Sequence, residues 1–199
     1  TMQGTSNDAL IMTGNAVVRA GSRLLLGGTG NRIIVSGNGG LTNDGIIKML
    51  DGCGCQQLEA LAVSNLDNNG TIEILGSAVI DLVDPGSTFV NNGTISVTTP
   101  YIALIRDASG SSRLALLGGS VTGTSTLFVE GAHIFWSGGT LDANSSDTSR
   151  AVLRASETTV TLMNTSLSGR FDVHSFHHDT SMVEGTIGFG VPIDVIASD

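Results

Sequence analysis

Three acidic residues recur at a constant interval and could do chemistry together. Asp84, Asp107 and Glu130 are equally spaced along the chain, and each follows a short apolar segment. If those segments stack on one another, the carboxylates come within about 5 Å, a separation that suits a retaining glycosidase or a bound Ca²⁺. The alternative is a set of solvated turn residues, because Asp84-Pro85-Gly86 has an ordinary turn composition. The residues alone leave both interpretations open.

A second candidate site lies near the C-terminus, where three of the four histidines fall between Phe171 and Asp179. In an extended strand, Asp172, His174 and His178 share one face. Imidazole and carboxylate groups in that arrangement can bind a divalent transition metal. The alternative is an exposed edge or an interface that responds to pH near about 6.

The two cysteines, Cys53 and Cys55, are separated by one glycine. This spacing is shorter than the redox C-x-x-C pattern, and no second pair completes a zinc site. The pair is interpreted as two thiols in a glycine-rich turn, with a strained local disulfide as the alternative.

A short sequence motif that occurs twice, called the phrase below, predicts the strands and turns that position these side chains. Asn-Asn-Gly-Thr-Ile begins at Asn68 and begins again at Asn91. A turn and a short alternating strand that return after about 20 to 30 residues are typical of one rung of a solenoid. Comparable combinations place equivalent positions at residues 22, 46, 71, 94, 120, 140, 165 and 186.

The intervals between these positions, about 20 to 26 residues, leave room for three short strands and three turns. We therefore predict an all-β fold, a single-stranded parallel β-helix of about eight rungs of three short strands, with a period of about 23 residues. The chain is expected to form one domain over residues 1–199. Residues 1–21 are an N-terminal rung or edge, 22–187 the phased rungs and 188–199 a C-terminal edge. Residues 56–62 are the one helix candidate.

Alternation within the phrase predicts which side chains fill the rod. Ile72 and Ile74 fall on one face of their strand, whereas Thr71 and Glu73 fall on the other. The isoleucine face is expected to be the core. The Asn-Gly turn is interpreted as a place where both residues tolerate positive φ.

Several other segments are apolar on both faces, which implies that the outer face is covered as well. Nothing in the sequence resembles a capping helix, and open solenoid ends invite pairing with another chain. We expect copies of the chain to associate as a trimer or fibre. The residues expected at that interface are Leu25, Ile34, Ile102, Leu104, Ala115 and Leu117.

Composition and charge exclude several partners. The net charge is −9 and Lys48 is the only lysine, so no basic cluster is available to neutralise phosphates. Nucleic acid is therefore not an expected partner. No apolar run approaches the roughly 20 residues that span a bilayer, so membrane insertion is not expected.

The repeated phrase and the rung pattern from about Ser22 to Ile187 resemble those of right-handed parallel β-helix proteins. The likeness is to passenger segments of autotransporter and haemagglutinin-type adhesins and to shafts of bacteriophage tail spikes and capsid fibres. It implies a right-handed coil and an extracellular place on a virion or cell surface. Pectate-lyase-like enzymes share the fold, but their dense basic and acidic groove is not visible here.

We expect from these patterns a non-enzymatic structural or adhesive protein, either a virion decoration or fibre protein or a cell-surface adhesin. Its partners would be copies of itself, with a capsid or cell-surface protein as a further partner. No cofactor is expected, and Ca²⁺ is the one ion considered. The alternative is a polysaccharide-binding or polysaccharide-cleaving module that uses Asp84, Asp107 and Glu130.

Overall fold

Parallel β-strands make up the regular structure of this protein. The computed structural model describes residues 2–3, 9–27, 31–36, 39–50, 59–99, 103–107, 109–137, 140–143, 153–156, 159–164, 169–174, 182–187 and 193–198. Within these ranges every regular element is a strand, and every strand pair is parallel. The same residues contain no helix long and apolar enough to cross a membrane.

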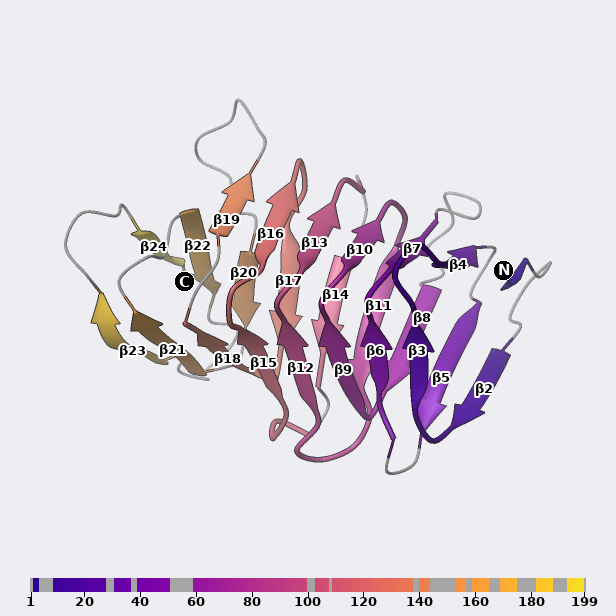
Figure 1. Ribbon diagram of the computed structural model, residues 1–199. Helices are drawn as coiled ribbons and strands as arrows, with labels where there is room; N and C mark the ends of the chain where they lie inside the picture. The colour runs from indigo at the N-terminus through magenta and orange to yellow at the C-terminus, as the bar shows by residue number, and fades with distance from the viewer. Residues whose placement is uncertain are drawn as a thin grey trace.

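The strands form three sheets, named A, B and C, that wrap around one core (Figure 1). Sheet A has seven strands: β1 (Met2–Gln3), β4 (Arg23–Gly27), β7 (Ile46–Met49), β10 (Thr71–Ile74), β13 (Thr94–Val97), β16 (Ser120–Gly123) and β19 (Thr140–Ala143). Sheet B has nine: β2 (Ala9–Thr13), β5 (Arg32–Ser36), β8 (Glu59–Val63), β11 (Ala78–Leu82), β14 (Ala103–Arg106), β17 (Leu127–Glu130), β20 (Leu153–Ser156), β22 (Gly169–His174) and β24 (Ile193–Ser198). Sheet C has eight: β3 (Ala16–Val18), β6 (Leu41–Asn43), β9 (Asn65–Asn68), β12 (Thr88–Asn91), β15 (Arg113–Leu116), β18 (His133–Trp136), β21 (Thr159–Asn164) and β23 (Met182–Ile187).

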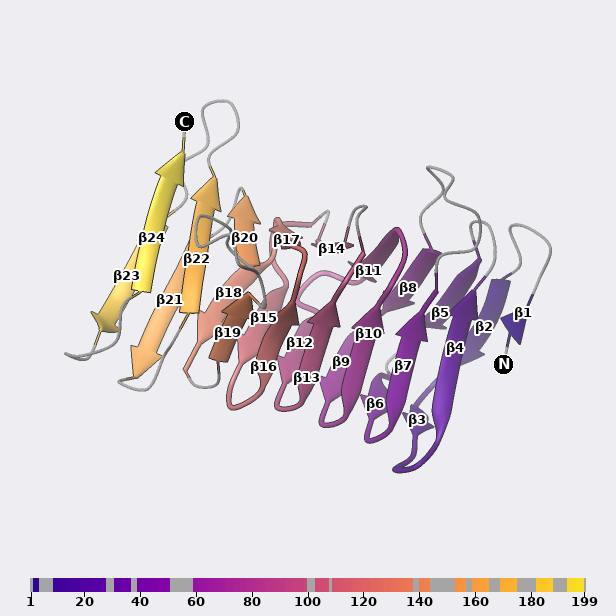
Figure 2. The same ribbon diagram turned by 90° about the horizontal axis from the view of Figure 1, so that it is seen from above.

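One rung passes through the three sheets in turn, as in β10, β11 and β12, before β13 pairs with β10. In Figure 1 the chain crosses the top in sheet A, descends behind in sheet B and rises in front in sheet C. Followed from the N-terminus, this path is a right-handed coil, and Figure 2 shows sheet A from above. The predicted parallel β-helix is therefore confirmed.

A single column of apolar residues runs the length of sheet B and shows how the register is kept. Leu10 is the first member and Ala197 the last, and every intervening partner is apolar. The members between them are Ile33, Leu61, Ile80, Ile105, Val129, Ala155 and Val173. Because side chains alternate along a strand, a slip of one residue would turn the apolar face of a strand to the solvent.

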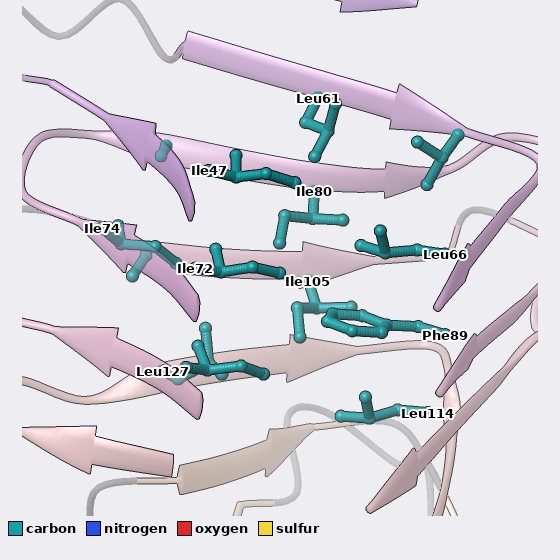
Figure 3. Packing of buried hydrophobic residues seen from close by; sticks show 14 of the residues in the cluster. Ile47, Leu61, Leu66, Ile72, Ile74, Ile80, Phe89, Ile105, Leu114 and Leu127 are labelled. Atoms are coloured by element: carbon teal, nitrogen blue, oxygen red, sulfur yellow. The ribbon is translucent and has the colours of Figure 1, made fainter. Parts of the chain in front are cut away.

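The core is filled by columns of this kind, and Figure 3 shows Ile72, Ile80, Phe89, Ile105 and other residues stacked between the sheets. Ile72 and Ile74 are fully buried, whereas Thr71 and Glu73 on the same strand are half-buried and face outward. The predicted inner and outer faces of the repeated phrase are confirmed. Full burial of each large aliphatic side chain stabilises the fold by about 1.5 to 3 kcal/mol before opposing entropy is counted.

The predicted phase positions hold in the middle of the rod and fail towards its ends. Ile46, Thr71, Thr94, Ser120 and Thr140 are successive partners in sheet A, as expected. The partner of Ile46 on the other side is Arg23, so the predicted Ser22 is wrong by one residue.

The last two predicted phase positions do not extend sheet A. Thr186 lies in β23 of sheet C, opposite Met163, and position 165 is outside the described residues. Sheet A has no described strand after β19, while sheets B and C continue. The number of rungs therefore differs from sheet to sheet rather than being a uniform eight.

The predicted helix at residues 56–62 is also wrong where the structure describes it. Residues 59–63 form β8, which pairs with β5 on one side and β11 on the other. Leu61 and Val63 are fully buried in the core. Tertiary packing thus overrides the local helix preference of Glu, Ala and Leu.

Buried asparagines line the corner between sheets C and A. Asn43, Asn68 and Asn91 end successive strands of sheet C and are fully buried. The Asn43 side-chain nitrogen donates to the Asn68 side-chain oxygen at 2.7 Å, and Asn68 donates to Asn91 at 2.6 Å. The three side chains therefore form a hydrogen-bonded asparagine ladder inside the rod.

Glycines form a second column at the same corner, through Gly45, Gly70, Gly93 and Gly119. A Cβ atom on Gly70 or Gly93 would lie 2.1 Å from the carbonyl oxygen of the preceding glycine of the column, and one on Gly119 would lie 2.0 Å from it. None of these glycines has a positive φ. The interpretation of these glycines as positive-φ turn residues is therefore wrong, because close stacking of successive rungs is what requires glycine here.

Candidate functional site

The three equally spaced acidic residues do not stack in register. Sheet B aligns Asp81 with Arg106 and Arg106 with Glu130. Asp107 is therefore one residue beyond the position opposite Glu130, and Asp84 is three residues beyond Asp81. The expected stacked arrangement of the carboxylates is wrong, because the turns after the strands differ in length. Whether any of these residues acts in catalysis stays a prediction.

Asp107 holds its own turn together. It is only 4% exposed. One carboxylate oxygen accepts the Ser109 backbone N–H at 2.8 Å and the Ser109 hydroxyl at 2.6 Å, while the other accepts the N–H groups of Ser111 at 2.8 Å and Ser112 at 2.6 Å. Burial alone would raise the pKa of Asp107, but hydrogen bonds from Ser109 and Ser112 outweigh it and hold the pKa below its ordinary value. This carboxylate is a turn-stabilising group.

The other two carboxylates of the set are exposed. Asp84 accepts a hydrogen bond from the Ser64 hydroxyl at 2.5 Å, and Ser87 closes the same turn by donating to the Asp84 backbone oxygen at 2.6 Å. Glu130 ends β17 on the outer face of sheet B. On the same face Asp81 has a cationic partner, since its carboxylate lies 2.8 Å from the Arg106 guanidinium.

The histidine-rich segment falls largely outside the described residues. Asp172 and His174 lie in β22, opposite Arg154 and Ser156 on one side and Ile196 and Ser198 on the other. His178 lies outside the described residues, as do Cys53 and Cys55. Among the residues whose side chains the structure describes, no group of three His, Cys, Asp or Glu residues could hold a metal ion.

The predicted interface residues are distributed over all three faces of the rod. Their register places Leu25 on the outside of sheet A, Ile34 and Leu104 on sheet B, and Ala115 on sheet C. Leu117 follows β15 and is 41% exposed. Ile102 lies outside the described residues. These residues do not gather into one apolar patch, and their role at an interface stays a prediction.

A groove of 480 Å³ on the outer face of sheet C was not predicted from the sequence. Polar side chains dominate its walls, together with one exposed valine: Asn15, Val17, Thr42, Asn65, Asp67 and Thr88. Its floor includes Gly39 and Gly40. The one sequence feature that could have pointed to the groove is the Gly-Gly pair just before β6. It points there only once the strands that flank β6 in the sheet are known.

At this groove, a glycine occupies one position in a column of outward-facing residues. The register places Gly40 between Asn15 and Asn65, which lie just before or at the start of β3 and β9. The Asn15 side-chain oxygen accepts the Gly40 N–H at 3.2 Å, and the Asn65 side-chain oxygen accepts the Thr88 N–H at 3.0 Å. The two asparagines are thereby fixed as opposite walls.

Further along the same face, the Arg113 guanidinium carbon lies 4.1 Å from the centre of the Phe135 ring. This distance is typical of a favourable cation–π contact between β15 and β18. No family model, curated protein or solved structure matched the chain in three comparisons.

Proposed function

We propose that this chain is a non-enzymatic structural and adhesive rod that works on the outside of a virion or a cell and associates with copies of itself. The observation that supports this most is that the buried carboxylate of Asp107 and the buried asparagine side chains serve the structure of the rod itself. The Asp107 carboxylate accepts four hydrogen bonds within its own turn, and the buried asparagines bond to one another. Such an arrangement favours a scaffold rather than a catalyst.

Self-association is supported by the first rung of the rod. Its strands β1, β2 and β3 are each the last member of a sheet and pair on one side only, within the described residues. Leu10, which lies on the core side, is 36% exposed, and the outward Ile11 and Val17 are 63% and 56% exposed. Unpaired strand edges with apolar side chains are surfaces that pair with another chain.

The mass in solution tests this proposal. At micromolar concentration we expect light scattering and sedimentation to give a mass well above the 20.3 kDa of one chain. Ile11→Glu is expected to weaken association by placing a charge at the apolar edge, whereas Thr98→Glu, at an exposed position after β13, serves as the matched control. A stable monomer of the parent chain would contradict self-association.

A turnover assay tests the non-enzymatic part separately. Incubation with bacterial and plant polysaccharides is expected to release neither reducing sugar nor unsaturated uronide. Robust release by the parent chain that is lost in Asp107→Asn would refute the structural interpretation and favour a polysaccharide-cleaving module.

A further inference from the structure

We infer that the groove on the outer face of sheet C binds a neutral oligosaccharide, which would be the ligand of the adhesive role. This inference rests on the adhesive part of the proposed function and adds a site and a ligand class to it. The groove crosses β3, β6 and β9, which lie side by side at the front of Figure 1 and are joined by backbone pairing.

The first argument is the set of hydrogen-bonding groups that the groove leaves free. The two wall asparagines use their side-chain oxygens for the Gly40 and Thr88 backbone N–H groups. The NH₂ groups of these two groove-lining asparagines have no protein acceptor among the described residues. The hydroxyl of Thr42 and the carboxylate of Asp67 are likewise without a described protein partner. A sugar hydroxyl both donates and accepts, so it matches a surface that offers both kinds of group.

Charge supplies the second argument, because the described lining of the groove contains one carboxylate and no cationic side chain. An anionic ligand such as a phosphate, a sulfated sugar or a uronide would face Asp67 without a counter-charge. A nonpolar peptide would find little apolar surface there, because Val17 is the one large apolar side chain in the described part of the lining. That valine can instead contact the C–H face of a sugar ring.

The third argument is shape. Gly40 carries no side chain in the outward row that contains Asn15 and Asn65, so a flat ring can approach the backbone at that rung. The outward-facing residues of sheet C repeat from rung to rung with the strand spacing of about 4.8 Å. The Val17, Thr42 and Asp67 row and the Asn65 and Thr88 row thus present groups at regular intervals to a ligand that is itself repetitive.

The test is a titration of the full chain with three probes: maltohexaose and cellohexaose as neutral oligosaccharides, and hexagalacturonate as the anionic one. We expect a neutral probe to shift the side-chain amide NMR signals of Asn15 and Asn65. Asp67→Ala is expected to weaken that binding about tenfold, because a hydrogen bond to a charged group is lost. Thr42→Val is expected to weaken it about threefold, because an uncharged hydrogen bond is lost.

The control is Thr71→Val, a matched substitution on the outer face of sheet A, which is expected to leave binding unchanged. Mass and far-ultraviolet circular dichroism of each variant must equal those of the parent. Failure of every probe to shift the two asparagine signals, or binding that Asp67→Ala leaves intact, would overturn the site. Preference for hexagalacturonate would overturn the ligand class. The mass measurement does not depend on the sugar titration. A monomeric parent chain would therefore contradict the proposed self-association, whereas absence of sugar binding would contradict only the groove as a ligand site.

Discussion

The Asn43 side-chain amide donates a hydrogen bond of 2.7 Å to the side-chain oxygen of Asn68, one rung further along the rod. Asn68 repeats the contact with Asn91, and it also donates to the Thr94 backbone oxygen at 3.3 Å. The ladder ends where Asn91 faces Leu116 and where Asn43 faces Val18. Three amides inside an apolar core are tolerated because each is bonded, and they oppose any slip of register between rungs.

Replacing the central asparagine should be costly. Asn68→Ala removes the bonds to both neighbours and leaves the buried Asn91 oxygen without its donor. We expect the free energy of unfolding to fall by about 2 to 4 kcal/mol, measured by guanidinium denaturation. The control is Asn92→Ala, since Asn92 is exposed and its contact with Asn69 is 3.4 Å long. A loss of less than about 0.5 kcal/mol is expected there. Equal losses in the two variants would contradict the ladder's role.

The glycine column predicts a steric effect at Gly93. Any Cβ there would meet the Gly70 carbonyl oxygen at 2.1 Å, so successive rungs would have to separate. Both Gly93→Ala and Gly93→Asn are expected to destabilise by at least about 1 to 3 kcal/mol. Gly118→Ala meets nothing within 4 Å and should change the melting temperature little. If Gly93→Asn were tolerated while Gly93→Ala was not, a left-handed backbone conformation would explain the requirement for glycine better than close stacking of the rungs.

Acid should weaken the turn at Asp107. Its pKa is lower in the folded chain than in the unfolded chain, so the carboxylate contributes stability above the unfolded pKa. That contribution begins to be lost below a pH of about 4 and is gone once the pH has fallen below the folded-state pKa. Melting temperatures over this range should show a drop that is smaller in Asp107→Asn than in the parent.

At neutral pH the same substitution should already destabilise the chain. An amide NH₂ in place of a carboxylate oxygen would face N–H donors from the serine turn, at a cost of about 1 to 3 kcal/mol. Asp67→Asn is the control, because Asp67 is exposed and its change should stay below about 0.5 kcal/mol. A parent whose acid sensitivity equals that of Asp107→Asn would contradict the assignment.

The ion pair on sheet A should contribute little. The Lys48 nitrogen lies 2.7 Å from a Glu73 carboxylate oxygen, and both side chains are about 30% exposed (31% and 28%). A double-mutant cycle with Lys48→Met and Glu73→Gln should give a coupling of about 0.2 to 1 kcal/mol, falling as salt rises to about 1 M. A coupling that salt does not reduce would show that water has less access to this pair than its exposure indicates.

The parts of the fold that depend on local sequence patterns could be predicted, whereas the parts that depend on the length of each rung could not. The inward position of Ile72 and its partner Ile95 follows from strand alternation, which is a local property. The position of Asp107 relative to Glu130 cannot be predicted from strand alternation, because it depends on the number of residues in each turn. The equal spacing of the acidic residues suggested alignment, yet the strands pair one residue away from it.

The candidate site illustrates the same division. The polar wall residues Asn15 and Asn65 lie far apart in the chain, and nothing local marks them as opposite walls of a groove. Gly40 had no evident role until its place in the column between them was known.

The sequence by itself determined the class of fold: parallel strands, a regular rung period and a core that contains the isoleucines of the repeated phrase. These features follow from the alternation of side chains along each strand and from the composition of the turns. Both are local properties that depend on residues close together in the sequence. Only the tertiary structure decided that Asn68 lies inside and Asn69 outside, that Gly70 is required by stacking and that residues 59–63 are a strand. Those outcomes depend on what the rungs above and below present, because contact across rungs fixes register and burial.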